Sequence, residues 1–291
     1  MPTYYVDTDV VGGSANGADW ANAYATLAGC IAGISKTLTA PLIINCRGAT
    51  ADTTQVYVNG FNATATNTIT IQVPIESRAK GKYDSTKYHL AVDAGYSHAC
   101  RVNNTYTTMI GIQAINTEAN GISCFYNDTT PCAFIGCIAY GQLTAGADGF
   151  ANGGFSHIND VGPTDYINCM AVDCVGPGFM SRTWEAFYYN CVAVGNTGLG
   201  FFCSGYQKVI ASNCYSGGNT AGDCYTGANT TYTLTTCRSG DGTFGTTVAY
   251  TNSGTAGTRF TSIANNAENI HIAAATSSLI NIGTDLSGTV A

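Results

Sequence analysis

A short motif recurs along the chain at a nearly constant interval. Segments such as "YINCMAV" and "YYNCVAV" share one frame. Six segments share this frame. Their fourth positions are Ile112, Cys137, Cys169, Cys191, Cys214 and Cys237. The last three steps are 22, 23 and 23 residues, and the earlier ones are 25 and 32. Such a period is typical of solenoids, propellers and repeat arrays.

The composition of each repeat selects among these architectures. Short β-prone runs alternate with Gly, Asn, Asp and Thr, and the patterning that helix pairs need is missing. A propeller blade needs about 40–45 residues, and a leucine-rich repeat needs its leucines. Two or three strands per unit fit coils that stack about 4.8 Å apart. The sequence therefore predicts an all-β protein, a single right-handed parallel β-helix of about ten coils.

The repeated cysteines have a structural explanation. Five equivalent cysteines would form an inward ladder, and Asn168, Asn190 and Asn213 before three of them would form an amide ladder at a turn. A second frame reads Gly-Phe, as in Gly178-Phe179, where glycine would let the backbone turn. Stacked side chains lie farther apart than the ~3.8 Å between Cβ atoms of a disulfide, so the thiols should stay reduced. No cysteine spacing is completed by a histidine, so no metal site is predicted.

The ends of the chain differ from the repeat. Trp20, Tyr24, Leu27, Ile31 and Ile34 form one helical stripe, which predicts a helix from Asp19 to Ile34 that caps the open end of the β-helix. The prediction is one domain over 1–291. Residues 1–40 form the first strand and capping helix, 41–259 form the coils with a long insertion at 141–164, and 260–291 form a closing coil.

Charge and hydropathy limit the classes of partner that the protein can bind. The 18 acidic and 11 basic residues give a net charge of −7, which argues against a nucleic-acid partner. No apolar run approaches the roughly 20 residues of a membrane span. The sequence starts without the basic and apolar stretches of a signal peptide. We expect an extracellular or virion-associated protein.

Candidate site residues gather on and after the insertion, since insertions in solenoids cluster on one face. Counting five residues on from each Gly-Phe gives Phe155, Trp184 and Tyr206, which form either an outward platform for sugar rings or an inward core ladder. Lys208 joins them as a substrate-binding candidate. The catalytic candidates are the ionisable side chains nearby: Asp148, His157, Asp160, Arg182 and Glu185.

The two ends of the chain carry a family resemblance. The opening "YYVDTDVVGGSANGADWANAYATLAGCIAGI" and the tail "IHIAAATSSLINIGTDLSG" resemble those of right-handed parallel β-helix proteins of the pectate-lyase-like superfamily. This resemblance implies the fold, but the superfamily includes lyases, hydrolases, tailspikes and adhesins. Calcium is the ion that the resemblance implies, because carboxylates bind it in the lyases of this superfamily. The residues of this chain by themselves predict no cofactor.

Two functions remain open at this point. The first is a carbohydrate-binding or adhesion protein that recognises a polysaccharide along one face, as a virion-associated protein or otherwise, and as a trimer if it is a tail protein. The alternative is a polysaccharide lyase or glycoside hydrolase with a non-standard active site. The low charge and the absence of the hydrolase signature favour the first, whereas Arg182 and Glu185 around Trp184 favour the second.

Overall fold

The structure is a computed structural model of the chain. It describes residues 1–93, 98–117, 122–141, 153–157, 163–182, 185–203, 208–226, 231–235, 237–239, 260–262 and 269–272.

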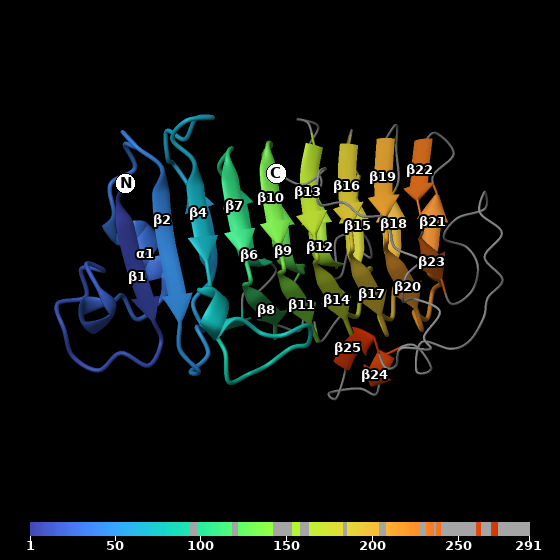
Figure 1. The fold of residues 1–291 in the computed structure, drawn as a ribbon, viewed down its shortest axis with the longest axis horizontal. Coiled ribbons are helices and arrows are strands. Elements are labelled where there is room, and N and C mark those ends of the chain that lie inside the picture. Colours follow the sequence, from blue (N-terminus) through green and yellow to red (C-terminus); the bar gives the residue numbers. More distant parts are fainter. Residues whose placement is uncertain are drawn as a thin grey trace.

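Three parallel sheets run along one axis, and successive coils add strands to them (Figure 1). Sheet A contains β1 (Thr3–Asp7), β2 (Leu42–Arg47), β4 (Ile69–Gln72), β7 (Thr107–Ile110), β10 (Cys132–Ile135), β13 (Pro163–Ile167), β16 (Glu185–Tyr189), β19 (Lys208–Ser212) and β22 (Thr231–Thr235). Sheet B contains β5 (His89–Val92), β8 (Gln113–Asn116), β11 (Ile138–Tyr140), β14 (Met170–Val172), β17 (Val192–Val194), β20 (Tyr215–Gly217) and β23 (Arg238–Ser239). Sheet C contains β3 (Val56–Asn59), β6 (His98–Asn103), β9 (Ser123–Asn127), β12 (Gly153–His157), β15 (Phe179–Ser181), β18 (Phe201–Cys203) and β21 (Cys224–Thr226).

From β4 onward the chain visits the sheets in the order A, B, C and then enters the next coil, and the predicted right-handed parallel β-helix is confirmed. In the described part, sheet A has nine strands, close to the ten coils expected. Two further strands, β24 (Phe260–Ser262) and β25 (Asn269–Ile272), fall in the expected closing coil and pair antiparallel.

Residues in the left-handed backbone conformation form the corner between sheets A and B. Asn168, Asn190 and Asn213 have φ angles of 54°, 53° and 56°, and Gly111 and Gly136 hold the same place in earlier coils. Asparagine and glycine adopt this conformation at the lowest cost. The Asn190 side chain donates a hydrogen bond to Asn168 Oδ1 at 3.1 Å, which confirms the predicted amide contact for this pair.

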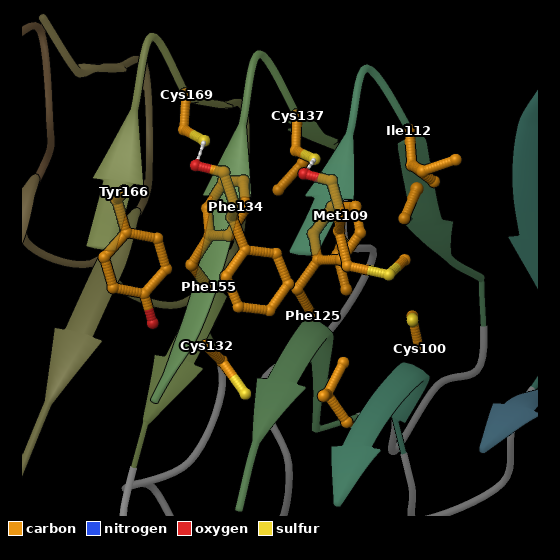
Figure 2. Packing of buried hydrophobic residues seen from close by; sticks show 14 of the residues in the cluster. Cys100, Met109, Ile112, Phe125, Cys132, Phe134, Cys137, Phe155, Tyr166 and Cys169 are labelled. Atoms are coloured by element: carbon orange, nitrogen blue, oxygen red, sulfur yellow. Dashed lines mark hydrogen bonds between the residues drawn. The ribbon is translucent and has the colours of Figure 1, made fainter. Parts of the chain in front are cut away.

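Two columns of aromatic rings fill the interior (Figure 2). Phe125, Phe155, Phe179 and Phe201 stack with ring centroids 4.9 Å apart. Phe134, Tyr166 and Tyr188 form the second column and meet the first edge-on. Phe155, Phe179 and Tyr166 therefore contact rings in the coils before and after them, which fixes the register between these coils.

Buried cysteines lie directly after the left-handed corner. Cys137, Cys169, Cys191, Cys214 and Cys237 are buried, and each thiol donates to a backbone carbonyl of the preceding coil at 3.2–3.4 Å. Figure 2 shows two of these contacts, from Cys137 and Cys169. All thirteen cysteines are free thiols.

The amphipathic segment near the N-terminus is only partly helical. A 3-10 turn, η1 (Trp20–Asn22), starts after Asp19, and the helix α1 spans Leu27–Gly33 with Thr26 as its N-cap. Between them Tyr24 donates its backbone N–H to Tyr5 O and accepts one from Asp7, both at 2.9 Å. The single helix predicted from Asp19 to Ile34 is therefore wrong, because backbone pairing with the free edge of β1 outweighs the helical stripe. Leu27, Cys30 and Ile31 are buried, so α1 still covers the core.

The basic segment 76–90 packs against the β-helix. It begins within the 3-10 turn η2 (Ile75–Ser77) and folds onto the outer face of sheet B. Tyr83 stacks on Tyr140 with centroids 4.5 Å apart, and Gln113 holds the backbone of Asp84 by two hydrogen bonds. The apolar outer face of sheet B explains this packing.

Candidate functional site

Two predicted site residues meet at the edge where the chain passes from sheet C into sheet A. Glu185 and Lys208 are the first residues of β16 and β19 and are paired in register. Lys208 Nζ lies 3.7 Å from Glu185 Oε1, with 52% and 35% of the two side chains exposed. Arg182 precedes β16 and is half-buried, and burial lowers its pKa. The structure thus places three predicted charges on neighbouring coils.

Phe155 does not belong to this surface, and its prediction as a substrate-binding residue is corrected. Its Cα partners are Phe125 and Phe179, and 1% of the residue is exposed. Phe155 therefore follows Gly154 as Phe179 follows Gly178. Counting from Gly149-Phe150 placed it wrongly, because the insertion shifts the repeat by five residues.

His157 is also an interior residue. It pairs with Asn127 and Ser181 in sheet C, is fully buried, and lies 3.5 Å from the Thr164 hydroxyl. Burial lowers its pKa to about 4, so the imidazole is neutral at physiological pH. A side chain without access to substrate is not a catalytic base, and this prediction is corrected.

Four predicted residues lie outside the described part of the chain. They are the catalytic candidates Asp148 and Asp160, which belong to the insertion, and the substrate-binding candidates Trp184 and Tyr206.

Asp165 is the functional candidate that the sequence ranking missed. It lies in β13 between Thr164 and Tyr166, which face the core, so its carboxylate faces outward from sheet A. It lines a shallow pocket of about 190 Å³ with Tyr106, Thr107, Thr108 and other residues of β7 and β10. Burial raises the pKa of Asp165. No described side chain forms an ion pair with this carboxylate.

The surroundings of Asp165 suit a hydroxyl-rich ligand. Phe187 is its Cα partner in β16 and is half-buried on the same outward row. Thr108 lies two strands away in that row, beyond Ala133. A carboxylate accepts hydrogen bonds from sugar hydroxyls, and an aromatic ring packs against the apolar face of a sugar. The alternation of strand residues is the signal that could have identified this site, once the inward phase was known.

A second outward row lies on sheet C. Tyr57, Arg101 and Tyr126 are Cα partners on β3, β6 and β9. The Arg101 guanidinium lies 5.1 Å from the ring centroid of Tyr57 and 5.6 Å from that of Tyr126. Asp128 forms an ion pair with Arg101. This row offers flat surfaces, but its charge is already neutralised within the protein.

The described residues show neither a cluster of metal ligands nor a helix that could span a membrane. Among the described residues, no three acidic, histidine or cysteine side chains are placed to hold a metal ion. No helix within these ranges is long and apolar enough to cross a membrane.

Comparison with solved structures supports the fold. The structure titled "Crystal structure of pectate lyase Pel9A" superposes with a TM-score of 0.53 at 14% identity, covering 98% of this chain and 92% of that chain. A rhamnogalacturonan lyase gives a TM-score of 0.49 at 12% identity, covering 82% of this chain and 74% of that one. No protein-family model matches the chain, and no curated protein matches its sequence.

Proposed function

We propose, starting from the right-handed parallel β-helix fold of the pectate-lyase-like superfamily that this chain adopts, that the protein binds a polysaccharide along the outer face of sheet A. Asp165 is the residue that carries the proposal, because it is a half-buried outward carboxylate beside a pocket lined by hydroxyls. Strands about 4.8 Å apart present their outward side chains as rows along the axis, and such rows suit a linear polymer.

The charged edge extends this surface to the next two coils. Glu185 begins the strand that pairs with β13, and Lys208 begins the one after it. An exposed ion pair contributes little to folding, typically 0–1 kcal/mol, so its two groups can exchange partners with a ligand at small cost. Arg182 lies three residues before Glu185, and Trp184 between them remains a proposed stacking residue.

Replacing Asp165 with asparagine tests the proposal. We expect Asp165→Asn to weaken binding at least tenfold in affinity electrophoresis against a panel of acidic and neutral polysaccharides. Asp173→Asn is the matched control, since it makes the same charge change on the same coil, after β14. Tyr57→Ala probes the alternative surface on sheet C. Loss of binding in Tyr57→Ala but not in Asp165→Asn would place the glycan on sheet C and contradict the proposal.

A second function, cleavage of the bound chain, is favoured by the same aspartate. A pKa raised by burial keeps a carboxyl group protonated to higher pH, as a general acid in glycoside hydrolysis requires. In a lyase, Lys208 or Arg182 would instead neutralise or deprotonate the sugar. Assays for new reducing ends and for unsaturated uronate absorbance distinguish the two reactions. Absence of both products from a polysaccharide that the protein binds would leave binding as its role.

The setting of this activity is part of the proposal. We infer an adhesion role outside the cell or on a virion, where a stack of coils holds a glycan-binding face at a distance from its anchor. The buried cysteines after the corner would then form a ladder with a purely structural role. Sedimentation analysis tests the trimer expected of a tail protein, and binding in a calcium chelator tests the metal.

A further inference from the structure

A second pocket lies at the N-terminal end of sheet A. It has a volume of about 360 Å³ and is lined by Asp7, Asp9, Arg47, Gly48, Ala49, Ser77, Thr86, Lys87 and Tyr88. We call it the N-terminal pocket. Strands β1 and β2 supply one wall, and the segment 76–90 supplies the other. In the sheet order, β4, β7 and β10 separate it from β13, which carries Asp165 (Figure 1).

The two carboxylates of the pocket already accept hydrogen bonds from the protein itself. Asp9 accepts hydrogen bonds from the backbone N–H groups of Ala49 and Thr50 at 2.6 and 2.9 Å, and these contacts help lower its pKa. Asp7 accepts from the backbone of Asp9 at 3.0 Å and from Arg47 Nε at 2.7 Å. These carboxylates therefore act as internal acceptors, and the groups left for a ligand are mostly donors.

Three of those donors come from the two walls of the pocket, one from β2 and two from the segment 76–90. Arg47 uses Nε for Asp7 and lies over the Trp20 ring at 4.0 Å, and 41% of its side chain is exposed. Lys87 Nζ forms no ion pair with the described residues. The Ser77 hydroxyl makes no hydrogen bond to a described residue. The Thr86 hydroxyl, in contrast, donates to Asp84 at 2.6 Å.

The charge of the pocket limits the ligand. Asp7 and Asp9 balance Arg47 and Lys87, so a group with a charge near −2, such as a phosphate monoester, would leave more uncompensated negative charge in the pocket than a singly charged group. A singly charged group with three acceptor oxygens matches the three donors better than a carboxylate with two. Four of the eleven basic residues lie in 76–90, and Lys87 is the one among them that lines the pocket.

We propose that the N-terminal pocket binds a sulfate monoester carried by a small hydroxyl-rich molecule, a sulfated sugar. Lys87, Arg47 and Ser77 would donate to the sulfate oxygens, and the remaining polar wall would face the hydroxyls. Almost every lining side chain is polar, which disfavours an apolar ligand. This site does not depend on the function proposed for sheet A.

Titration calorimetry of the full chain with glucose 6-sulfate tests the proposal. We expect saturable binding that Lys87→Gln weakens at least tenfold. Lys82→Gln is the matched control, since it removes the same charge from the same segment outside the pocket. Glucose 6-phosphate, glucuronate, glucose and inorganic sulfate are the comparison ligands, and each should bind more weakly than glucose 6-sulfate.

Several results would overturn the proposal. Unchanged affinity in Lys87→Gln, or an equal loss in Lys82→Gln, would show that the pocket is not the site. Equal affinity for inorganic sulfate would mean that the sugar is not recognised, and equal affinity for glucuronate would mean that three oxygens are not needed. No heat from wild type at millimolar ligand would exclude the site. None of these outcomes bears on Asp165, so the two proposals fail independently.

Discussion

At the scale of single residues, Asp165 shows how a functional candidate can carry a cost in stability. Its environment raises its pKa above the usual value of 3.8 because burial disfavours the ionised form. The folded state therefore holds this proton more tightly than the unfolded state does. Below a pH of 3.8 the group is protonated in both states, and above the folded pKa its charge destabilises the fold.

We expect Asp165→Asn to be more stable than wild type at pH 7, by less than about 1 kcal/mol because the site is partly solvated. The difference should disappear as the pH falls below 3.8. Urea denaturation at pH 7 and pH 3 measures it, with Asp173→Asn as the reference. A variant less stable than wild type at pH 7 would mean that the carboxylate has a stabilising partner, which removes the argument for a ligand.

The same scale shows what one sequence can reveal. The corner asparagines were predictable because few residue types adopt a left-handed conformation, so Asn168 and Asn190 mark the turn by themselves. Asp165 was not singled out, since the direction of a lone aspartate in a strand follows only once the inward phase of its neighbours Thr164 and Tyr166 is known. Phe155 was misplaced because a single insertion shifts the count, and only the pairing of β12 with β15 restores it.

At the scale of elements, an internal asparagine pair joins the coils between sheets B and C. Asn196 is fully buried and accepts a hydrogen bond from the backbone of Cys174 at 3.0 Å. Its side-chain amide donates to Ala171 O at 3.2 Å and to Asn219 Oδ1 at 2.8 Å. This inner pair was not predicted from the sequence, because its asparagines look like those before the cysteines in a repeat.

We expect Asn196→Ala to destabilise the protein by about 3 kcal/mol, because buried backbone groups of two coils lose their partners. Denaturant unfolding followed by circular dichroism measures the change. Asn190→Gly is the control, since Asn190 is exposed and glycine accepts its φ of 53°. A cost near zero for Asn196→Ala would indicate that water replaces the amide and that the inner pair does not hold the coils together.

In the capping segment, a free strand edge changes the conformation of a locally helical pattern. A helical stripe from Trp20 to Ile34 is a correct reading of the local pattern, but the free edge of β1 competes for the same backbone. The resulting 3-10 turn, extended link and short helix keep Leu27 and Ile31 buried. Local periodicity therefore identified the buried side chains, whereas the conformation depended on an edge that only the assembled fold presents.

At the scale of the whole molecule, the repeat predicted the architecture because stacking coils must place like residues in register. The 22- and 23-residue steps, together with the short β-prone runs in each repeat, were sufficient to select a β-helix. The functional face was harder to predict, since all three sheets have outward rows. The charge on sheet A, the aromatic row on sheet C and the apolar cover on sheet B become distinct only in three dimensions.

The thiols report on the integrity of the whole solenoid. Twelve of the thirteen cysteines are buried, and Cys224 is the partly exposed one. Burial raises the pKa of Cys30 and Cys100 to about 12 and that of Cys132 to about 11. Reaction with a disulfide reagent requires an accessible thiolate. These thiols should therefore react only when the stack of coils opens.

We expect about one thiol of the native protein to react quickly with a chromogenic disulfide reagent. All thirteen should react after unfolding without reductant. The slow native reaction should follow the unfolding rate measured by circular dichroism, because each core thiol is covered by the coils on both sides. Cys224→Ser should abolish the fast phase and leave the slow one, which assigns it. A single reactive thiol after unfolding would instead reveal six disulfides, and the reduced core inferred from the stacking of free cysteines would be wrong.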